Sequence, residues 1–284
     1  MIVVTGTKRS GTSMWMQVLR AAGVPSIGEA FPRVWEESIR EANPRGFYES
    51  RFRSGINYRT NPDPKTGDYL PPGATRDTAV KVFIPGLVRS DVAYLRRVIG
   101  TIRPWREYCT SWSRLLHLEQ EWKKGRNGGA VEGANEVADP APLPHPAPSP
   151  AAVALPTAVE WWFENYELVR DVSTRRYAFT FVSYDAMLRD PAAIVHKVVP
   201  WLGVGDADAA IAAVAPLLRT QNAPSDPHAV DAGLSDAELR VFDDLYTEID
   251  RGAQLPASLL NDMNDVQTSL LTKYNKLELE RDVR

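Results

Sequence analysis

The sequence predicts an α/β fold in three layers, with a central parallel sheet of about four to five strands flanked by helices. Four short apolar runs have the length and the β-branched content of buried strands, at 2–5, 79–84, 98–102 and 177–182. Segments with a helical spacing of apolar residues alternate with them. Because the strands are apolar along their whole length, we expect helices on both faces of the sheet.

The predicted helices follow the strands in order. The first strand leads into a helix over 12–22. Two later segments place large apolar side chains on one helical face: Trp105, Tyr108, Trp112, Leu115 and Trp122, and then Val159, Trp162, Phe163, Tyr166 and Val169. A further apolar stripe is formed by Ile194, Val195, Val198, Val199 and Leu202.

Composition and charge exclude several classes of protein. The chain has 284 residues, of which 44% are hydrophobic and 24% charged, as in globular proteins. Its net charge of −3 offers no general field for nucleic acid. The single cysteine, Cys109, can form neither an intramolecular disulfide nor a cysteine zinc site. With no signal peptide and no apolar run long enough to span a bilayer, the sequence predicts a cytoplasmic protein without a membrane span.

A segment rich in Gly, Pro and Ala occupies 125–156, and seven of the 22 prolines lie between residues 138 and 156. Such a composition cannot bury a core and favours extended or polyproline II chain. Because similar helices are predicted on both sides, we interpret the segment as a flexible insertion in one domain that spans 1–284. A proline-rich docking motif is the alternative.

The C-terminal part is predicted to be helical. Ser235 and Glu238 have the spacing of a capping box and open a helix. A helical tail over 256–284 follows, with apolar residues three and four positions apart: Leu259, Met263, Val266, Leu270, Tyr274 and Leu277. This stripe spans barely three heptads. We therefore expect it to dock onto its own domain, with a homodimer through this helix as the alternative.

A glycine-rich turn, Gly6-Thr-Lys-Arg-Ser-Gly-Thr-Ser13, lies directly after the first strand and opens the first helix. Glycines permit the positive φ angles of a tight turn, and the N–H groups at the helix N-terminus then face an anion. Lys8 and Arg9 add positive charge, and Thr12 and Ser13 add hydroxyl donors. The pattern predicts a phosphate-binding loop, and with it a P-loop fold.

Thr12 stands where nucleotide-hydrolysing P-loop proteins carry the lysine that reaches the β- and γ-phosphates. An aspartate that would hold Mg²⁺ is also not evident, because Asp185 comes late after the strand at 177–182. A P-loop ATP-dependent small-molecule kinase is therefore the weaker alternative. A non-catalytic nucleotide-binding protein is the third.

The run Lys8-Arg-Ser-Gly-Thr-Ser13 resembles the 5′-phosphosulfate-binding loop of the P-loop sulfotransferases of bacterial type, which use 3′-phosphoadenosine 5′-phosphosulfate (PAPS) as co-substrate. That loop reads Pro-Lys/Arg-Ser-Gly-Thr-Ser/Thr, so Arg9 takes the place of its basic residue. Met14 stands where the family often has tryptophan, and Trp15 comes one residue later. The resemblance implies that the donor is bound by Lys8, Arg9, Ser10, Gly11, Thr12 and Ser13.

Two further segments extend the resemblance. Arg103 follows a strand and Ser111 lies eight positions later in the predicted helix, which is similar to the 3′-phosphate site of the family. The family's Asp or Asn before the proline is missing here. A weaker match covers 179–191 and the turn Trp201-Leu-Gly203. The resemblance implies that Arg103 and Ser111 hold the 3′-phosphate of PAPS.

The resemblance also implies the chemistry, an in-line transfer of a sulfuryl group that requires no metal. Arg9 would stabilise the leaving group. Lys81 stands at a strand end where the family carries Lys-Thr-His-Leu-Pro, so it would protonate or polarise the bridging oxygen, unless it is merely a solvated lysine. The histidine base of the family falls on Phe83. Glu49, beside two aromatic residues that would raise its pKa, is therefore the expected base. Lesser candidates are Glu29, Glu36 and Glu37.

The acceptor is expected to be a hydroxyl, less favourably an amine, on a small molecule, a lipid or a glycan. Aromatic residues would line such a pocket or fill the core. They are Phe31, Trp35, Phe47, Trp161 and Trp162.

Overall fold

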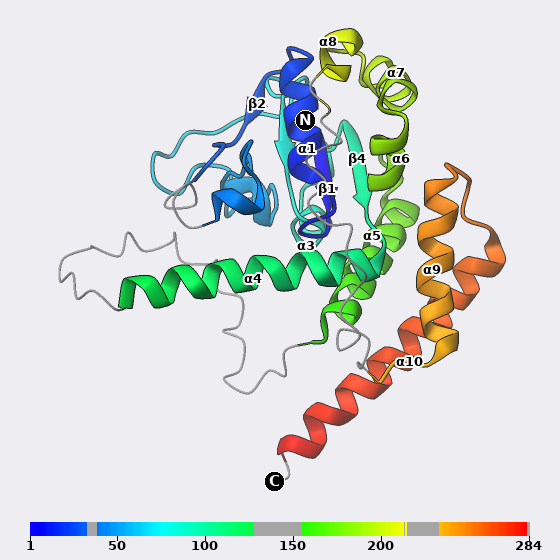
Figure 1. Ribbon diagram of the computed structural model, residues 1–284. Helices are drawn as coiled ribbons and strands as arrows, with labels where there is room; N and C mark the ends of the chain where they lie inside the picture. The colour runs from blue at the N-terminus through cyan, green and yellow to red at the C-terminus, as the bar shows by residue number, and fades with distance from the viewer. Residues whose placement is uncertain (33–38, 128–154, 213, 215–232, 283–284) are drawn as a thin grey trace.

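The computed structural model describes residues 1–32, 39–127, 155–212, 214 and 233–282. Within them, five parallel strands form one sheet in the order β2-β3-β1-β4-β5 (Figure 1). Helices cover both faces of this sheet, which confirms the predicted α/β fold. The strands are β1 Ile2–Gly6, β2 Ser26–Ile27, β3 Ala79–Lys81, β4 Arg97–Ile102 and β5 Phe179–Ser183.

The strand bounds differ from those predicted by more than one residue at two places. The third strand, β3, ends at Lys81 and not at Ile84, because Phe83 is the N-cap of helix α3 (Ile84–Val88). The last strand begins at Phe179, two residues later than predicted. The edge strand β2 was not predicted, since a strand of two residues leaves no apolar run in the sequence.

One face of the sheet is covered by α1 (Thr12–Ala21), α7 (Pro191–Leu202) and α8 (Ala207–Ile211). Alternate strand side chains point into this layer, as the two-residue repeat of a strand requires. They are Ile2, Val4, Ala79, Ile99 and Val182, and all are buried. The short helix α6 (Tyr184–Arg189) links β5 to this layer.

The opposite face is covered by α3 and α5 (Thr157–Arg175), which pack against each other. The side chains that point into this layer are Val3, Val80 and Val98 of the strands, with Met1 and Val82 directly beside them. The long helix α4 (Trp105–Asn127) packs against α5 and extends away from the sheet (Figure 1). Three short 3₁₀ helices complete the described elements, at Arg40–Ala42, Arg51–Ser54 and Val92–Tyr94.

The C-terminal helices α9 (Asp236–Asp250) and α10 (Ala257–Asp282) pack beside α5 (Figure 1). The predicted capping box is present, because Ser235 accepts from the Glu238 N–H and the Glu238 side chain accepts from the Ser235 N–H. The apolar stripe of α10 is buried against its own chain, through Leu259, Met263, Val266 and Leu270. A homodimer through this helix stays a prediction.

Two sequence predictions lie partly or wholly outside the described residues. Most of the predicted insertion, 128–154, falls there, as do Trp35, Glu36 and Glu37.

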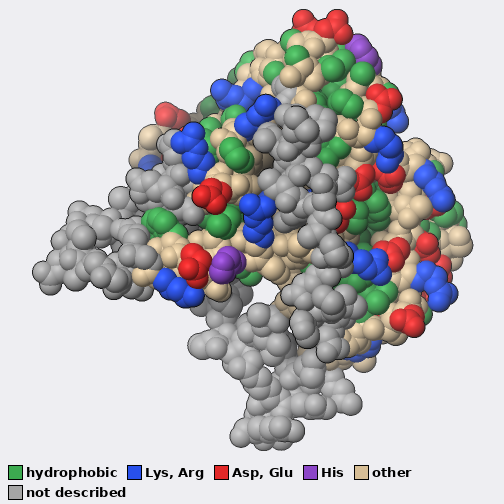
Figure 2. Space-filling view, viewed as in Figure 1, with side chains coloured by type: hydrophobic (Ala, Val, Ile, Leu, Met, Phe, Trp, Pro, Cys, Tyr) green, Lys and Arg blue, Asp and Glu red, His purple; other side chains and the backbone are tan. Residues whose placement is uncertain are grey.

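None of the described helices is long and apolar enough to cross a bilayer. On the face seen in Figure 2, basic and acidic side chains alternate over the described surface.

The chain leaves the neighbouring strands β1 and β4 in opposite directions. From β1 it passes through α1 to β2 at one edge, and from β4 it passes through α4 and α5 to β5 at the other. In open α/β sheets, ligands bind outside the carboxyl ends of the strands at such a switch point. The register pairs Gly6 with Thr101, so both strands end at the same level.

Candidate functional site

A cavity of about 540 Å³ lies at this switch point. It is lined by the loop after β1, by Lys81 at the end of β3, by Arg103 after β4 and by Tyr184 after β5. The segment 39–54 and helices α1, α3, α4, α5 and α6 contribute the remaining wall. A volume between about 300 and 1,000 Å³ is typical of small-molecule sites.

The loop between β1 and α1 has the conformation of an anion-binding turn. Arg9 and Gly11 have positive φ angles of 69° and 104°. The Ser10 hydroxyl lies 2.7 Å from Thr7 O and 2.7 Å from Thr101 Oγ1, which fixes the loop on β4. The N–H groups of Arg9, Gly11 and Thr12 donate to no acceptor in the described part of the chain. They are therefore free to bind an anion.

Gly11 cannot be replaced without a steric conflict. A Cβ atom at this position would lie 2.9 Å from Cδ2 of Tyr184, in addition to the strain of its φ angle of +104°. Gly6 is equally restricted, because a Cβ would lie 2.4 Å from Thr101 Oγ1. The two glycines of the sequence motif are thus required by close contacts as well as by the turn.

Arg9 connects the glycine-rich loop, which is expected to bind the 5′-phosphosulfate, to Ser111, which is expected to bind the 3′-phosphate. Its Nε atom donates to Ser111 Oγ at 3.0 Å, and its Nη2 atom donates to Ala42 O at 2.9 Å. Burial and the nearby Arg103 lower the pKa of Arg9 to about 10. A guanidinium with a lowered pKa would gain from a bound anion, because the anion restores the favourable charge.

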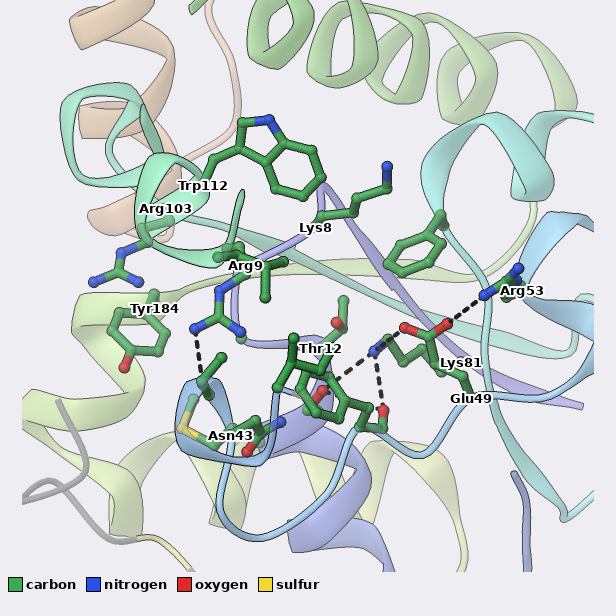
Figure 3. Close-up of a pocket in the computed structure, with 18 of the residues that line it drawn as sticks. Lys8, Arg9, Thr12, Asn43, Glu49, Arg53, Lys81, Arg103, Trp112 and Tyr184 are labelled. Atoms are coloured by element: carbon green, nitrogen blue, oxygen red, sulfur yellow. Dashed lines mark hydrogen bonds and ion pairs between the residues drawn. The ribbon is translucent and has the colours of Figure 1, made fainter. Parts of the chain in front are cut away.

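Arg103 is buried at the carboxyl end of β4. Its Nε and Nη2 atoms donate to Glu107 Oε2 at 3.1 and 3.0 Å, and its guanidinium lies 4.5 Å from the centre of the Tyr184 ring. Ser111 bonds Arg9 and not Arg103 in this structure, and the binding of one phosphate by Arg103 and Ser111 together stays a prediction. Arg9 and Arg103 both line the cavity on one side (Figure 3), and the buried Ser111 is joined to them through its hydrogen bond with Arg9.

Lys81 and Glu49 form a buried ion pair at the other side of the cavity (Figure 3). The Lys81 ammonium lies 3.1 Å from Glu49 Oε1, 2.9 Å from Phe47 O and 3.2 Å from Ser13 Oγ. With 3% of its surface exposed, Lys81 is not the solvated lysine that the sequence left as an alternative. Burial lowers the pKa of Lys81, and Glu49 opposes this shift.

Glu49 does not stand in the apolar environment expected from its aromatic neighbours. Its Oε2 atom is paired with Arg53 at 3.3 Å, so two cations contact one carboxylate. Glu29 pairs with Glu49 through a β-bridge, and its side chain is exposed. The described geometry therefore couples Glu49 to Lys81 and gives Glu29 no place in the cavity wall.

The aromatic candidates separate into core and cavity residues. Trp161 and Trp162 are fully buried in the core formed by α4, α5, α9 and α10. Trp15 is buried beneath α1 and does not line the cavity, whereas Met14 does. Phe47 also lines the cavity. Stacking of a base on Trp15 is therefore excluded by its packing.

The sequence matches no protein-family model and no curated protein. Among solved structures, the chain is similar to the sulfotransferase domain from the olefin synthase of Synechococcus PCC 7002. The identity is 14% and the TM-score 0.37, over 95% of this chain and 94% of that chain. A likeness at this level establishes neither a family nor an activity, so function is inferred below from this chain's own residues.

Several cavity residues were not assigned to the site from the sequence, among them Trp112, Tyr184 and Glu164. Trp112 supports the Lys8 ammonium, which lies 4.7 Å from the centre of its ring, and Tyr184 covers Arg103. Glu164 reaches the cavity from α5. Trp112 directly follows Ser111 and could have been found from that position, but Glu164 has the sequence appearance of an ordinary polar helix residue.

The arrangement disfavours a magnesium-dependent kinase. Thr12 lines the cavity in place of the P-loop lysine. Asp185, the aspartate nearest to a metal-binding position in the sequence, accepts a hydrogen bond from the Tyr246 hydroxyl at 2.6 Å.

Proposed function

We propose that this protein is a PAPS-dependent sulfotransferase that moves the sulfuryl group to a hydroxyl, less favourably an amine, of a small-molecule, lipid or glycan acceptor. The observation that carries the proposal is the pair of guanidiniums in the cavity wall, the half-buried Arg9 and the buried Arg103, beside the open N–H groups of the loop. Arg9 contacts only a hydroxyl and a carbonyl among the described residues. Arg103 is paired with Glu107, whereas Arg9 has no acidic partner among the described residues, so the charge of Arg9 favours an anionic ligand.

The cavity offers one group for each charged part of PAPS. The loop N–H groups, Thr12 and Ser13 would bind the 5′-phosphosulfate, as helix N-termini bind phosphate. Arg103 and Ser111 would bind the 3′-phosphate, with Arg9 between the two ends because it bonds Ser111. The planar fork of an arginine suits a phosphate bound through two oxygens. These roles remain those that the sequence predicted.

Transfer requires an acceptor oxygen to form a bond with sulfur while the bond from sulfur to the bridging oxygen breaks. The electron pair of that bond stays on the phosphate oxygen, where negative charge develops. Lys81 lies 3.2 Å from Ser13 Oγ and so reaches the loop that would hold this phosphate. Its ammonium would stabilise the developing charge or protonate the oxygen. Glu49 holds Lys81 in place through their ion pair. To act as the base, Glu49 would first have to break its ion pair with Lys81.

Calorimetric titration with adenosine 3′,5′-bisphosphate in the presence of a magnesium chelator tests the proposal. We expect tight binding by the wild-type protein and a loss of about 10- to 100-fold in Arg103→Ala, because a charged hydrogen bond contributes about 1.5–3 kcal/mol. Arg240→Ala is the matched control, since Arg240 is exposed on α9 and does not line the cavity. Binding of ATP only, and only with Mg²⁺, would favour the kinase instead.

The acceptor can be found by transfer of radiolabelled sulfate from PAPS into the small molecules of a cell lysate. Labelled products are separated and identified, and Arg103→Ala serves as the inactive comparison. A labelled product that requires the intact cavity defines the acceptor class. If label appears only as free sulfate, water is the acceptor under these conditions.

A further inference from the structure

Glu164 is a carboxyl group in the cavity wall that no part of the proposed donor site uses. It lies on α5, which packs against α3 and α4, and it shares the cavity with Lys8 and Trp112. Its Oε2 atom is buried and has no hydrogen-bond partner among the described residues. A buried carboxyl oxygen without a partner is costly to maintain, so such a group is expected to serve a ligand.

The surroundings of Glu164 favour its protonated form near neutral pH. Burial and the charge of Glu160, one turn earlier on α5, raise its pKa to about 8, against the opposing effect of Lys8. Tyr108 of α4 lies close enough for Glu164 to raise the pKa of its phenol. Glu160, Lys8 and Glu167 act electrostatically on Glu164, which in turn acts on Tyr108, and the other titratable groups of the cavity include Arg89 and Glu119.

Glu164 and Glu49 have opposite environments within one cavity. Glu49 is held by two cations, Lys81 and Arg53, and must break an ion pair to take up a proton. Glu164 contacts no cation at ion-pair distance among the described residues, and its free oxygen can accept a hydrogen bond at once. Two carboxyl groups whose environments differ in this way serve different roles in acid–base chemistry.

Lys8 connects Glu164 to the donor loop. Lys8 and Arg9 are consecutive, yet their side chains point to different sides of the cavity (Figure 3). Arg9 turns toward Ser111, whereas Lys8 lies over Trp112 and acts electrostatically on Glu164. Glu164 therefore lines the same cavity as the loop and interacts electrostatically with Lys8 of that loop.

From this placement we infer that Glu164 is the residue that binds the acceptor's hydroxyl and accepts its proton during transfer, an assignment that rests on the proposed sulfotransferase activity. The hydroxyl oxygen forms the new bond to sulfur as its proton passes to Glu164 Oε2. The bond from sulfur to the bridging oxygen breaks, and its electron pair leaves with adenosine 3′,5′-bisphosphate. The ionised form of Glu164 is needed to begin each cycle, so the rate should rise with pH.

The test compares Glu164→Gln, Glu160→Gln and Glu49→Gln. Transfer of radiolabelled sulfate to the identified acceptor, or to water, is measured against pH, and adenosine bisphosphate binding is measured in parallel. For the wild type, we expect kcat/KM to rise through about pH 8. Glu164→Gln should lower kcat by about 10²- to 10⁴-fold, remove the inflection and leave nucleotide binding unchanged.

Glu160→Gln distinguishes a proton acceptor from a structural residue. Removal of the Glu160 charge should move the inflection to lower pH without abolishing it, because that charge raises the pKa of Glu164. Difference infrared spectra give a second readout that needs no turnover. A carboxylic acid carbonyl band should vanish as the pH rises through about 8 and should be absent from Glu164→Gln.

Two results would overturn the assignment to Glu164. In one, Glu164→Gln shows the same dependence of kcat/KM on pH as the wild type. In the other, the inflection of that profile is kept in Glu164→Gln and disappears in Glu49→Gln. Failure of the proposed activity gives a different pattern, in which the wild-type protein binds no adenosine bisphosphate and transfers no sulfate, while the infrared band still titrates with Glu164.

Discussion

Replacement of Glu49 by glutamine removes the main counter-charge of a buried lysine while it preserves the shape of the side chain. The Lys81 ammonium lies 3.1 Å from Glu49 Oε1, and 3% of Lys81 and 6% of Glu49 is exposed. Loss of one partner of a buried ion pair costs about 3–5 kcal/mol, because the remaining charge stays buried without compensation. The pair with Arg53, whose side chain is 34% exposed, adds at most about 1 kcal/mol.

The expected loss can be read from thermal and urea unfolding. At about 2 °C per kcal/mol for a chain of this length, Glu49→Gln should lower the melting temperature by roughly 6–10 °C. Glu29→Gln is the matched control, since Glu29 is exposed and pairs with Glu49 only through the backbone. It should remain within about 0.5 kcal/mol of wild type. A Glu49→Gln variant as stable as the Glu29 control would refute the reasoning.

The pH dependence of this loss has a defined sign. Burial lowers the pKa of Lys81, so the folded protein loses this proton at a lower pH than the unfolded chain does. In Glu49→Gln the pKa of Lys81 falls further, because the favourable charge of Glu49 is gone. The difference in unfolding free energy between wild type and variant should therefore shrink as the pH rises from neutral. If the difference in unfolding free energy between wild type and Glu49→Gln grew with pH, the result would contradict a buried ion pair between Lys81 and Glu49.

Three further predictions concern the loop, Arg9 and the C-terminal helix. Gly11→Ala should weaken adenosine bisphosphate binding by about 10- to 100-fold, since its Cβ would add a contact of 2.9 Å to the φ strain. The affinity for the same nucleotide should fall as the pH rises through about 10, where Arg9 loses its proton. Leu270→Ala should lower the unfolding free energy by about 2–5 kcal/mol, because Leu270 is fully buried in the core shared by α9 and α10.

Each of these predictions has an internal comparison. The control for Gly11→Ala is Gly23→Ala. Gly23 has a φ of +80°, but no atom lies within 4 Å of the new Cβ, so this variant introduces backbone strain alone and should bind nucleotide as the wild type does. An affinity that stays constant up to pH 11 would show that Arg9 keeps its proton there and would contradict its lowered pKa. Leu271→Ala affects a side chain that is 45% exposed, and equal losses at the two leucines would disprove the docking of α10.

The fold was predictable because its strong signals are local and periodic. Residues 2–6 and 97–102 are apolar along nearly their whole length, and they became the central strands β1 and β4. Register, strand order and the two-residue strand β2 were not predictable, since they depend on contacts distant in sequence. The early end of β3 was hidden because Phe83 and Ile84 continue the apolar run after the strand has ended.

The candidate site was predictable only where chemistry coincides with a sequence motif. Residues 6–13 and Arg103 were found because a glycine-rich turn and a strand end have fixed structural meanings. The bond from Arg9 to Ser111 joins residues 102 positions apart and required the folded chain. Glu164 was missed for the same reason, since its burial results from the packing of α5 against its neighbours and from nothing in its local sequence.

The most direct test of the central claim follows the two halves of PAPS in one reaction, with a magnesium chelator present. If the cavity catalyses sulfuryl transfer, radiolabelled sulfate will appear in the acceptor together with an equal amount of adenosine 3′,5′-bisphosphate, and both products will be lost in Arg103→Ala but retained in Arg240→Ala. Transfer of phosphate from ATP with Mg²⁺, and no consumption of PAPS, would contradict the account.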